Sequence, residues 1–187
     1  MQRLALAFSL TTLLAPAAFA TEYTHLLPEQ SDIAFSYRQM GVSMDGRFRS
    51  VAATELSFDP ARPEEARAVV EVALASIDTG SEENDAEVAG KDWLHSQAFP
   101  TARFELAGIE ALGDDRYQAT GTLSIKGTRR AVVAPATFSE QDGIGVLQGS
   151  FTLRRGDYAI GEGEWSAFDI VANDIQVSFR VSMAAGQ

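Results

Sequence analysis

The sequence predicts an all-β protein, an antiparallel barrel or sandwich with one short helix. Large apolar residues alternate with small or polar ones along most of the chain after residue 20, which is typical of strands with one buried and one wetted side. Turn-forming residues separate these segments at short intervals, so neighbouring segments are expected to pair as antiparallel strands. No linker, repeat or low-complexity tract interrupts the pattern, which indicates one domain over residues 21–187.

The strands are predicted from period-two alternation, taken in chain order. The segments are residues 33–37, 70–74, 104–106, 123–125, 147–153 and 175–183. Turns are expected at Asp59-Pro60, Gly113-Asp114-Asp115, Gly127-Thr128 and Asp142-Gly143, because these residue types tolerate the backbone angles that tight turns need.

One stretch, from Ser81 to Leu94, is rich in Glu, Asp and Ala and does not alternate. We predict a short helix here with Ser81 as its N-cap, because Ser accepts a hydrogen bond from the free backbone N–H groups of the first turn. Glu82, Glu83 and Asp85 would then lie near the positive end of the helix dipole.

The first 20 residues have the pattern of a secretory signal peptide. Arg3 precedes an apolar run over residues 4–14, and Ala18-Phe19-Ala20 fits the small-x-small cleavage site. The run is shorter than the roughly 20 residues that a membrane-spanning helix needs. We therefore predict cleavage after Ala20, location in the periplasm and no stable membrane insertion of the remaining chain.

The composition excludes several kinds of function. The chain has no Cys, so disulfides, thiol chemistry and Cys-based metal sites are ruled out. The formal charge is −11, and an acidic surface repels phosphate backbones and anionic headgroups. Nucleic-acid binding is therefore not expected, and no cofactor is implied.

Candidate catalytic and metal-binding residues are few. His25 and His95 stand outside any metal-ligand spacing, so no metal site is expected. Glu162 and Glu164 are two residues apart beside Trp165 and could form an acid–base pair on a glycan or amphiphile. An acidic turn beside a packing Trp explains them equally simply, and we prefer that interpretation.

Two further clusters allow more than one interpretation. Asp78, Glu82, Glu83 and Asp85 lack the spacing of a calcium loop and suit a helix start better. The basic residues Lys126, Arg129 and Arg130 are predicted to form a solvated corner, although they could also meet the phosphate of a lipid.

The chain also resembles the YceI-like family of isoprenoid-binding proteins over residues 31–181. The resemblance is an ordered set of short motifs: Ser31-x-Ile33-x-Phe35, Met40-Gly41, Gly46-x-Phe48, Ser76-Ile77-Asp78-Thr79-Gly80, Trp93-Leu94, Phe99-Pro100-x-Ala102-x-Phe104, Gly121-x-Leu123-x-Ile125-Lys126-Gly127-Thr128 and Arg155-x-Asp157-Tyr158-x-Ile160-Gly161-x-Gly163-x-Trp165. Leu94, where the family commonly has an aromatic, Ala159 and residues 166–168 depart from the family pattern, which leaves the ligand's identity open.

The resemblance implies an extended lipocalin-like antiparallel β-barrel of about eight strands with a short covering helix. It also implies a periplasmic carrier whose interior holds an isoprenoid or similar amphiphile of the quinone or polyprenyl phosphate class. Composition alone, with 11 Phe, 4 Tyr, 4 Met and 2 Trp, would favour an ordinary filled core. The oligomeric state is not determined by the sequence, and a homodimer stays open.

If the barrel is hollow, strand alternation predicts which side chains line it. The predicted ligand-binding residues are Phe35, Tyr37, Met40, Phe48, Trp93, Phe99, Phe104, Phe151, Val177 and Phe179, with Trp93 and Phe99 covering one end. An error of one residue in register would turn any of these strands inside out. The alternative functions are an enzyme using Glu162 and Glu164, and an interaction module with a filled barrel.

Overall fold

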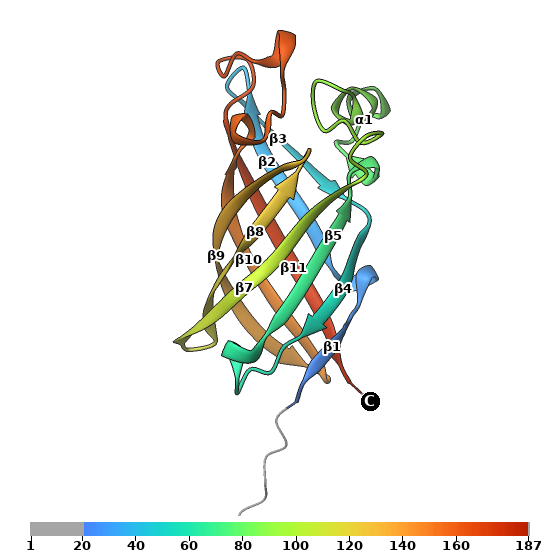
Figure 1. Cartoon of the computed structure of the whole chain (residues 1–187). Coiled ribbons are helices and arrows are strands. Elements are labelled where there is room, and N and C mark those ends of the chain that lie inside the picture. The colour runs from blue at the N-terminus through green and yellow to red at the C-terminus, as the bar shows by residue number, and fades with distance from the viewer. Residues whose placement is uncertain (1–20, 187) are drawn as a thin grey trace, which may run out of the picture.

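The computed structural model describes residues 21–186, which form one antiparallel sheet curled into a barrel (Figure 1). The expected signal peptide, residues 1–20, lies outside the described part. The strands are β1 (Tyr23–Leu26), β2 (Asp32–Gln39), β3 (Val42–Phe48), β4 (Val51–Ser57), β5 (Arg67–Ala73), β6 (Ile77–Asp78), β7 (Thr101–Gly113), β8 (Arg116–Ile125), β9 (Thr128–Gln141), β10 (Ile144–Arg154) and β11 (Asp174–Ala185). The all-β prediction is confirmed.

Neighbouring strands follow the order β4-β5-β7-β8-β9-β10-β11-β2-β3-β6, and β1 pairs with β11 outside this path. β1 lies between β11 and the end of β4, since Tyr23 and Phe58 exchange two backbone hydrogen bonds of 2.8 and 2.9 Å. At the other end, the backbone bond from Arg49 N to Ser76 O joins the β3–β4 corner to the segment before β6. The sheet therefore closes through β1 at one end and through the Arg49–Ser76 backbone bond at the other.

The eleven strands of the described chain exceed the eight or so that were expected. β9 gave little sequence signal because two of its inward residues are Ala134 and Ala136, which are only 4% exposed yet too small to produce a visible alternation. β1 and β6 are only four and two residues long.

The predicted hairpin turn at Asp142-Gly143 is confirmed, and the turn predicted at Gly127-Thr128 lies one residue earlier, at Lys126 and Gly127, because Thr128 begins β9. Asp142 and Gly143 both have positive φ, of 54° and 78°, which is the geometry of the tight turns that match the twist of paired strands. Met40 and Gly41 connect β2 to β3 in the same way, with φ of 47° and 82°.

The predicted helix is present but shorter than expected. α1 spans Glu82–Ala89, and the Ser81 hydroxyl accepts a hydrogen bond from Asn84 N as its N-cap. The helix ends at Gly90, whose N–H bonds to Glu87 O. α1 lies at the end of the barrel opposite the C-terminus, beside the segment that links β10 to β11 (Figure 1). The 3₁₀ turns are η1 (Pro28–Gln30), η2 (Pro63–Glu65), η3 (Leu74–Ser76), η4 (Arg155–Tyr158) and η5 (Gly163–Trp165).

Two apolar clusters fill different parts of the barrel. The cluster near β1 includes Tyr23, Phe58 and Phe138, and the ring centroid of Phe138 lies 5.7 Å from that of Tyr23 and 5.3 Å from that of Phe58. The cluster near α1 includes Leu74, Leu94 and other residues, namely Ile77, Ala102, Leu123, Ile125, Leu153 and Tyr158. Side chains of both clusters border one internal cavity.

Candidate ligand cavity

The cavity inside the barrel has a volume of about 320 Å³, at the lower end of the range for small-molecule sites. Its wall is almost entirely apolar, because each strand turns alternate residues inward. The few polar or charged residues on its border lie near its two ends: Gln39, Ser57, Arg67, Thr79, Asn84, Glu87 and Arg155. Such a surface suits an apolar chain and offers few partners to a polar molecule.

Eight of the ten residues predicted to line the barrel border this cavity. They are Phe35, Tyr37, Phe48, Trp93, Phe104, Phe151, Val177 and Phe179. Burial raises the pKa of Tyr37, as expected for a phenol held against apolar neighbours. Whether these side chains contact a ligand stays a prediction.

Met40 and Phe99 do not border the cavity, so the structure does not bring them together with the other eight residues. Met40 stands in the β2–β3 turn, where its positive φ ends the strand alternation, and its side chain is 73% exposed. Phe99 follows the turns after α1 and packs edge-on against the His95 ring and against Gly127.

The ends of three inward-facing Phe rings lie against glycines of neighbouring strands. A Cβ on Gly46 would touch Phe35 Cζ and lie 2.7 Å from Cε2, and Phe35 and Gly46 are direct partners across β2 and β3. A Cβ on Gly121 would touch Phe104 Cζ as well as Glu105 O, and a Cβ on Gly149 would touch Pro135 O and lie 2.7 Å from Phe179 Cζ. Because each ring occupies the space of an absent side chain, the aromatic wall is thin and the lumen stays open.

Arg155 is the charged residue buried deepest in the described chain, at 1% exposure. Its guanidinium donates to six backbone carbonyl oxygens of the β10–β11 segment, those of Ile160, Gly161, Trp165, Ala167, Val171 and Ala172, at 2.7 to 3.3 Å. Among residues 21–186 no carboxylate forms an ion pair with it. Burial lowers the pKa of Arg155, but a guanidinium stays charged in proteins.

Two tryptophans lie together at the end of the barrel near α1. Trp93 and Trp165 pack with ring centroids 5.5 Å apart, and Arg155 lies 5.7 Å from the Trp93 ring. Trp165 Nε1 donates to Glu87 Oε1 at 2.9 Å, which ties η5 to α1. Asp92 O accepts the N–H groups of Gly161 and the residue after it at 2.8 Å, so the two segments form one cap.

Sequence reasoning missed Arg155 and Trp165 as cavity residues. Arg155 was named only as one position of the family motif, yet it continues the inward face of Phe151 and Leu153 by the same period of two. That period was the signal that could have found it. Trp165 was considered only as a neighbour of two glutamates.

The geometry does not favour an acid–base pair at Glu162 and Glu164. Both side chains are exposed, and Glu162 bonds to Lys126 Nζ at 2.7 Å. This hydrogen bond and the lysine charge lower the pKa of Glu162, whereas a general acid needs a raised one.

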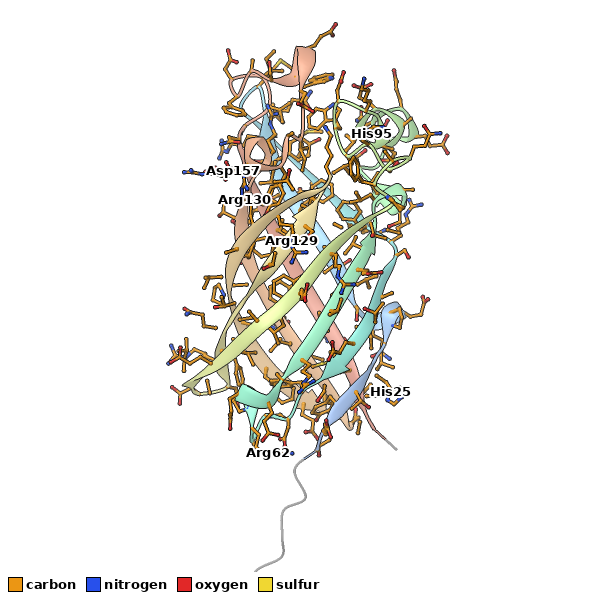
Figure 2. The ribbon with its side chains drawn as sticks, viewed as in Figure 1. His25, Arg62, His95, Arg129, Arg130 and Asp157 are labelled. Carbon is orange, nitrogen blue, oxygen red and sulfur yellow. The ribbon has the colours of Figure 1, made fainter. Side chains whose placement is uncertain are left out.

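The other clusters also have structural partners. Asp78 pairs with Arg47 and Arg49 at 3.2 and 3.0 Å, and Asp85 accepts from the backbone and hydroxyl of Thr79. The described residues contain no group of three or more His, Asp or Glu suited to a metal ion. Figure 2 shows His25 and His95 at opposite ends of the barrel.

The basic corner does not face the cavity. Lys126 Nζ is engaged with Ala159 O at 2.6 Å and with Glu162, and Arg129 lies 3.6 Å from Glu105 with a side chain 63% exposed. None of Lys126, Arg129 and Arg130 borders the cavity, so a phosphate held by them would lie outside it.

In the part of the chain that the structure describes, no helix has the length and apolar character needed to span a membrane.

Comparisons with known proteins agree with this architecture. The model of the YceI-like domain matches residues 25–183. A UPF0312 protein of Pseudomonas savastanoi pv. phaseolicola is 30% identical over 185 residues, 94% of each chain, and one of Azotobacter vinelandii is 33% identical over 136 residues, 72% of this chain and 70% of the relative.

Solved structures with the same fold are also known. BcnA of Burkholderia cenocepacia has a TM-score of 0.81 at 30% identity, covering 84% of this chain and 98% of its own. A polyisoprenoid binding domain from Saccharophagus degradans has a TM-score of 0.68 at 14% identity, over 89% of this chain and 99% of its own, which shows a shared fold. With the family model matched over nearly all of the described barrel, the chain belongs to the YceI-like family.

Proposed function

We propose that this protein binds and carries a long-chain isoprenoid or similar amphiphile in its barrel. The observation that carries the proposal is the apolar internal cavity, kept open by rings laid against glycines. The fold shared with a polyisoprenoid binding domain supports it.

The energetics favour a chain of this kind. Each methylene group moved from water into an apolar site gains about 0.8 kcal/mol, so a long tail gains much more from the cavity than any single polar contact supplies. The wall combines aromatic rings with Val, Leu and Ile side chains, which leave an irregular surface suited to methyl branches.

We place the carrier in the periplasm, on the strength of the signal-peptide pattern in residues 1–20. An isoprenoid tail is poorly soluble in water, so transfer between two membranes needs a protein that shields it. Export and cleavage are testable by N-terminal sequencing of the protein from a periplasmic extract, which should begin at Thr21.

The lipid is tested by extracting the purified protein with organic solvent and analysing the extract by mass spectrometry. Phe104→Asp and Phe179→Asp place a charge in the wall and should abolish the copurified lipid. Val133→Asp is the matched control, because Val133 lies on β9 and is 53% exposed. A barrel that copurifies no lipid and takes up none from detergent would favour a filled interaction module instead.

A charged wall can unfold the barrel, so a second variant is needed. Val177→Phe enlarges a cavity-lining side chain without adding charge and should reduce the bound lipid while the circular dichroism spectrum stays unchanged. Unchanged lipid content in a folded Val177→Phe protein would contradict binding in this cavity.

A further inference from the structure

The β2–β3 hairpin has a free edge at the end of the barrel where α1 lies (Figure 1). Within residues 21–186, β6 pairs with β3 only at Arg47 and Phe48, so residues 42–46 of β3 have β2 as their single strand partner. On the β2 side, the hairpin is held by the β10–β11 segment, through the bond from Met40 N to Ile170 O at 2.8 Å. The free edge of the hairpin therefore belongs to β3.

The two faces of this hairpin end differ in polarity. Tyr37 and Gln39 border the cavity, and their direct cross-strand partners are Met44 and Val42. Directly paired residues share one face of a sheet, so Met44 and Val42 lie on the inward face. The residues of the opposite face are Arg38, Ser43 and Asp45. An apolar face behind a polar one is typical of a sheet that covers something on one side.

Met44 and Val42, here called the hairpin face, extend the inward face of the sheet past the cavity. Neither residue borders the cavity. Val42 is 61% exposed, and Met44 is partly exposed. Single exposed apolar residues are common on protein surfaces, but these two continue the face on which Tyr37 lines the lumen. The hairpin face is therefore an open apolar surface joined to the cavity wall.

The cavity reaches the protein surface at this same end. Asn84 and Glu87 of α1 border the cavity and are exposed. At the other end, Tyr23, Phe58 and Met183 are at most 4% exposed and pack into one cluster. The end near α1 is therefore the end from which a bound chain can project.

The cavity is too small for a whole long-chain isoprenoid. Its volume of about 320 Å³ is at the lower end of the range for sites that enclose drug-sized ligands. An octaprenyl chain, with its eight isoprene units, is larger than such a ligand, so part of it must lie outside. Because a polar headgroup buried against an apolar wall loses its hydrogen bonds to water, the outside part is the one that carries the head.

We propose that the hairpin face binds the part of the lipid chain next to the headgroup, while the far end of the tail lies in the cavity. The headgroup then lies in water beyond the hairpin. Long chains gain contacts with the hairpin face that short chains cannot reach, so the hairpin face selects for chain length. This inference rests on the proposed function, since it extends the binding site of the same ligand.

The test compares two prenyl alcohols with the same headgroup, a triprenyl alcohol of a size that the cavity encloses and an octaprenyl alcohol. Their binding to delipidated protein is measured by the lipid retained after gel filtration from detergent. The double variant Val42→Ser/Met44→Ser makes the hairpin face polar without adding charge. Val133→Ser is the matched control, because Val133 lies on β9, is 53% exposed and does not border the cavity.

The double variant should weaken binding of the octaprenyl alcohol about tenfold or more, because covering an exposed apolar side chain is worth about that factor. Binding of the triprenyl alcohol should stay unchanged, and Val133→Ser should bind both alcohols as the wild-type protein does. The other end of the cavity provides the competing exit, since Arg67 borders the cavity there and is exposed. Arg67→Ser is therefore measured in the same series.

Methionine methyl groups report the position of the chain in the wild-type protein. The chain has four methionines, so its ¹³C-methyl spectrum is simple, and single substitutions assign the signals. Met44 lies on the hairpin face, whereas Met183 borders the cavity and is 1% exposed. The octaprenyl alcohol should shift the signals of both residues, and the triprenyl alcohol should shift that of Met183 alone.

The outcomes are distinct. Equal weakening of both alcohols by the double variant, no weakening of either, or an unshifted Met44 signal with the octaprenyl alcohol would overturn the assignment of the hairpin face. Selective loss of the octaprenyl alcohol in Arg67→Ser would overturn it in favour of the other end.

Two other occupants of the hairpin face would also overturn the proposal. A lipid-free dimer that becomes monomeric in the double variant, seen in the same gel filtration, would assign the hairpin face to a second copy of the chain. Flotation of lipid-free protein with phosphatidylcholine vesicles, lost in the double variant, would assign it to a bilayer. Failure of the wild-type protein to bind either alcohol would instead count against the proposed function itself.

Discussion

The hollow interior depends on glycines placed under aromatic rings, and Gly46→Ala tests this directly. The added methyl would touch Phe35 Cζ and lie 2.7 Å from Cε2, whereas carbon atoms pack at about 3.5–4.0 Å. The ring must therefore move by about 1 Å or rotate, and the open side available to it is the cavity. We expect the ring to project into the lumen and to occupy space that the lipid tail needs.

The effect on stability should be moderate. Overpacking in a core costs about 1–3 kcal/mol, and replacing Gly by Ala inside a strand returns about 0.5–1 kcal/mol. A net loss of about 0.5–2 kcal/mol lowers the Tm by roughly 1–8 °C for a chain of this size. Lipid retention should fall more strongly than stability, because the ring yields into the cavity.

The assay compares Gly46→Ala with Gly108→Ala in thermal unfolding and in lipid retention. Gly108 is the matched control, since it lies in β7 and a Cβ there meets no atom within 4 Å. Phe35→Leu added to Gly46→Ala should restore lipid binding by removing the ring. Identical behaviour of the two alanine variants, or no recovery in the double variant, would refute the role of the Gly46–Phe35 pair.

Three other predictions concern Arg155 in the cap, the four tyrosines and Met40 in the β2–β3 turn. Arg155→Met should destabilise the fold by about 3–5 kcal/mol in urea unfolding, because six carbonyls lose a buried cationic donor; a loss below about 1 kcal/mol would show that the β10–β11 segment does not need it. All four tyrosines have raised pKa values, with burial as the main cause. The unfolded chain therefore releases these protons first, and stability should fall as the pH rises above about 10. In an alkaline titration at the tyrosinate absorbance the four should ionise together with unfolding, and a group that titrates normally in the folded state would contradict this. Met40→Ser should leave lipid content unchanged, since the side chain is 73% exposed; a lipid-depleted variant would place the turn in the entry path.

The inward faces of the strands were predictable because alternation is a local property. Phe104, Phe151 and Phe179 are each separated by one residue from an apolar neighbour on the same face, and this spacing alone places them in the interior. Met40 was predicted against this alternation, because Phe35, Tyr37 and Gln39 border the cavity and Met40 follows Gln39 directly. Its positive φ in the β2–β3 turn and its 73% exposed side chain agree with a place away from the lumen.

The cap could not be predicted because it depends on contacts between distant segments. Trp93 and Trp165 meet only when the residues after α1 approach the β10–β11 segment, through bonds from the backbone of residues 161 and 162 to Asp92 O. The β10–β11 segment has no regular pattern of its own, and its shape comes from the carbonyls that converge on Arg155. A lone Arg in a sequence gives no indication of such a set of acceptors.

The choice between a filled and a hollow barrel rests on cross-strand register. Composition favoured a filled core because large side chains are plentiful, and it would be right if each ring pointed toward the barrel axis. The register sets Phe35 opposite Gly46 and Phe179 opposite Gly149, so these rings lie along the wall. The same aromatic residues that would fill a barrel thus become a thin lining when the partner strand supplies a glycine. The distribution of glycine across the sheet, more than the number of aromatic residues, decides whether this barrel has room for a ligand.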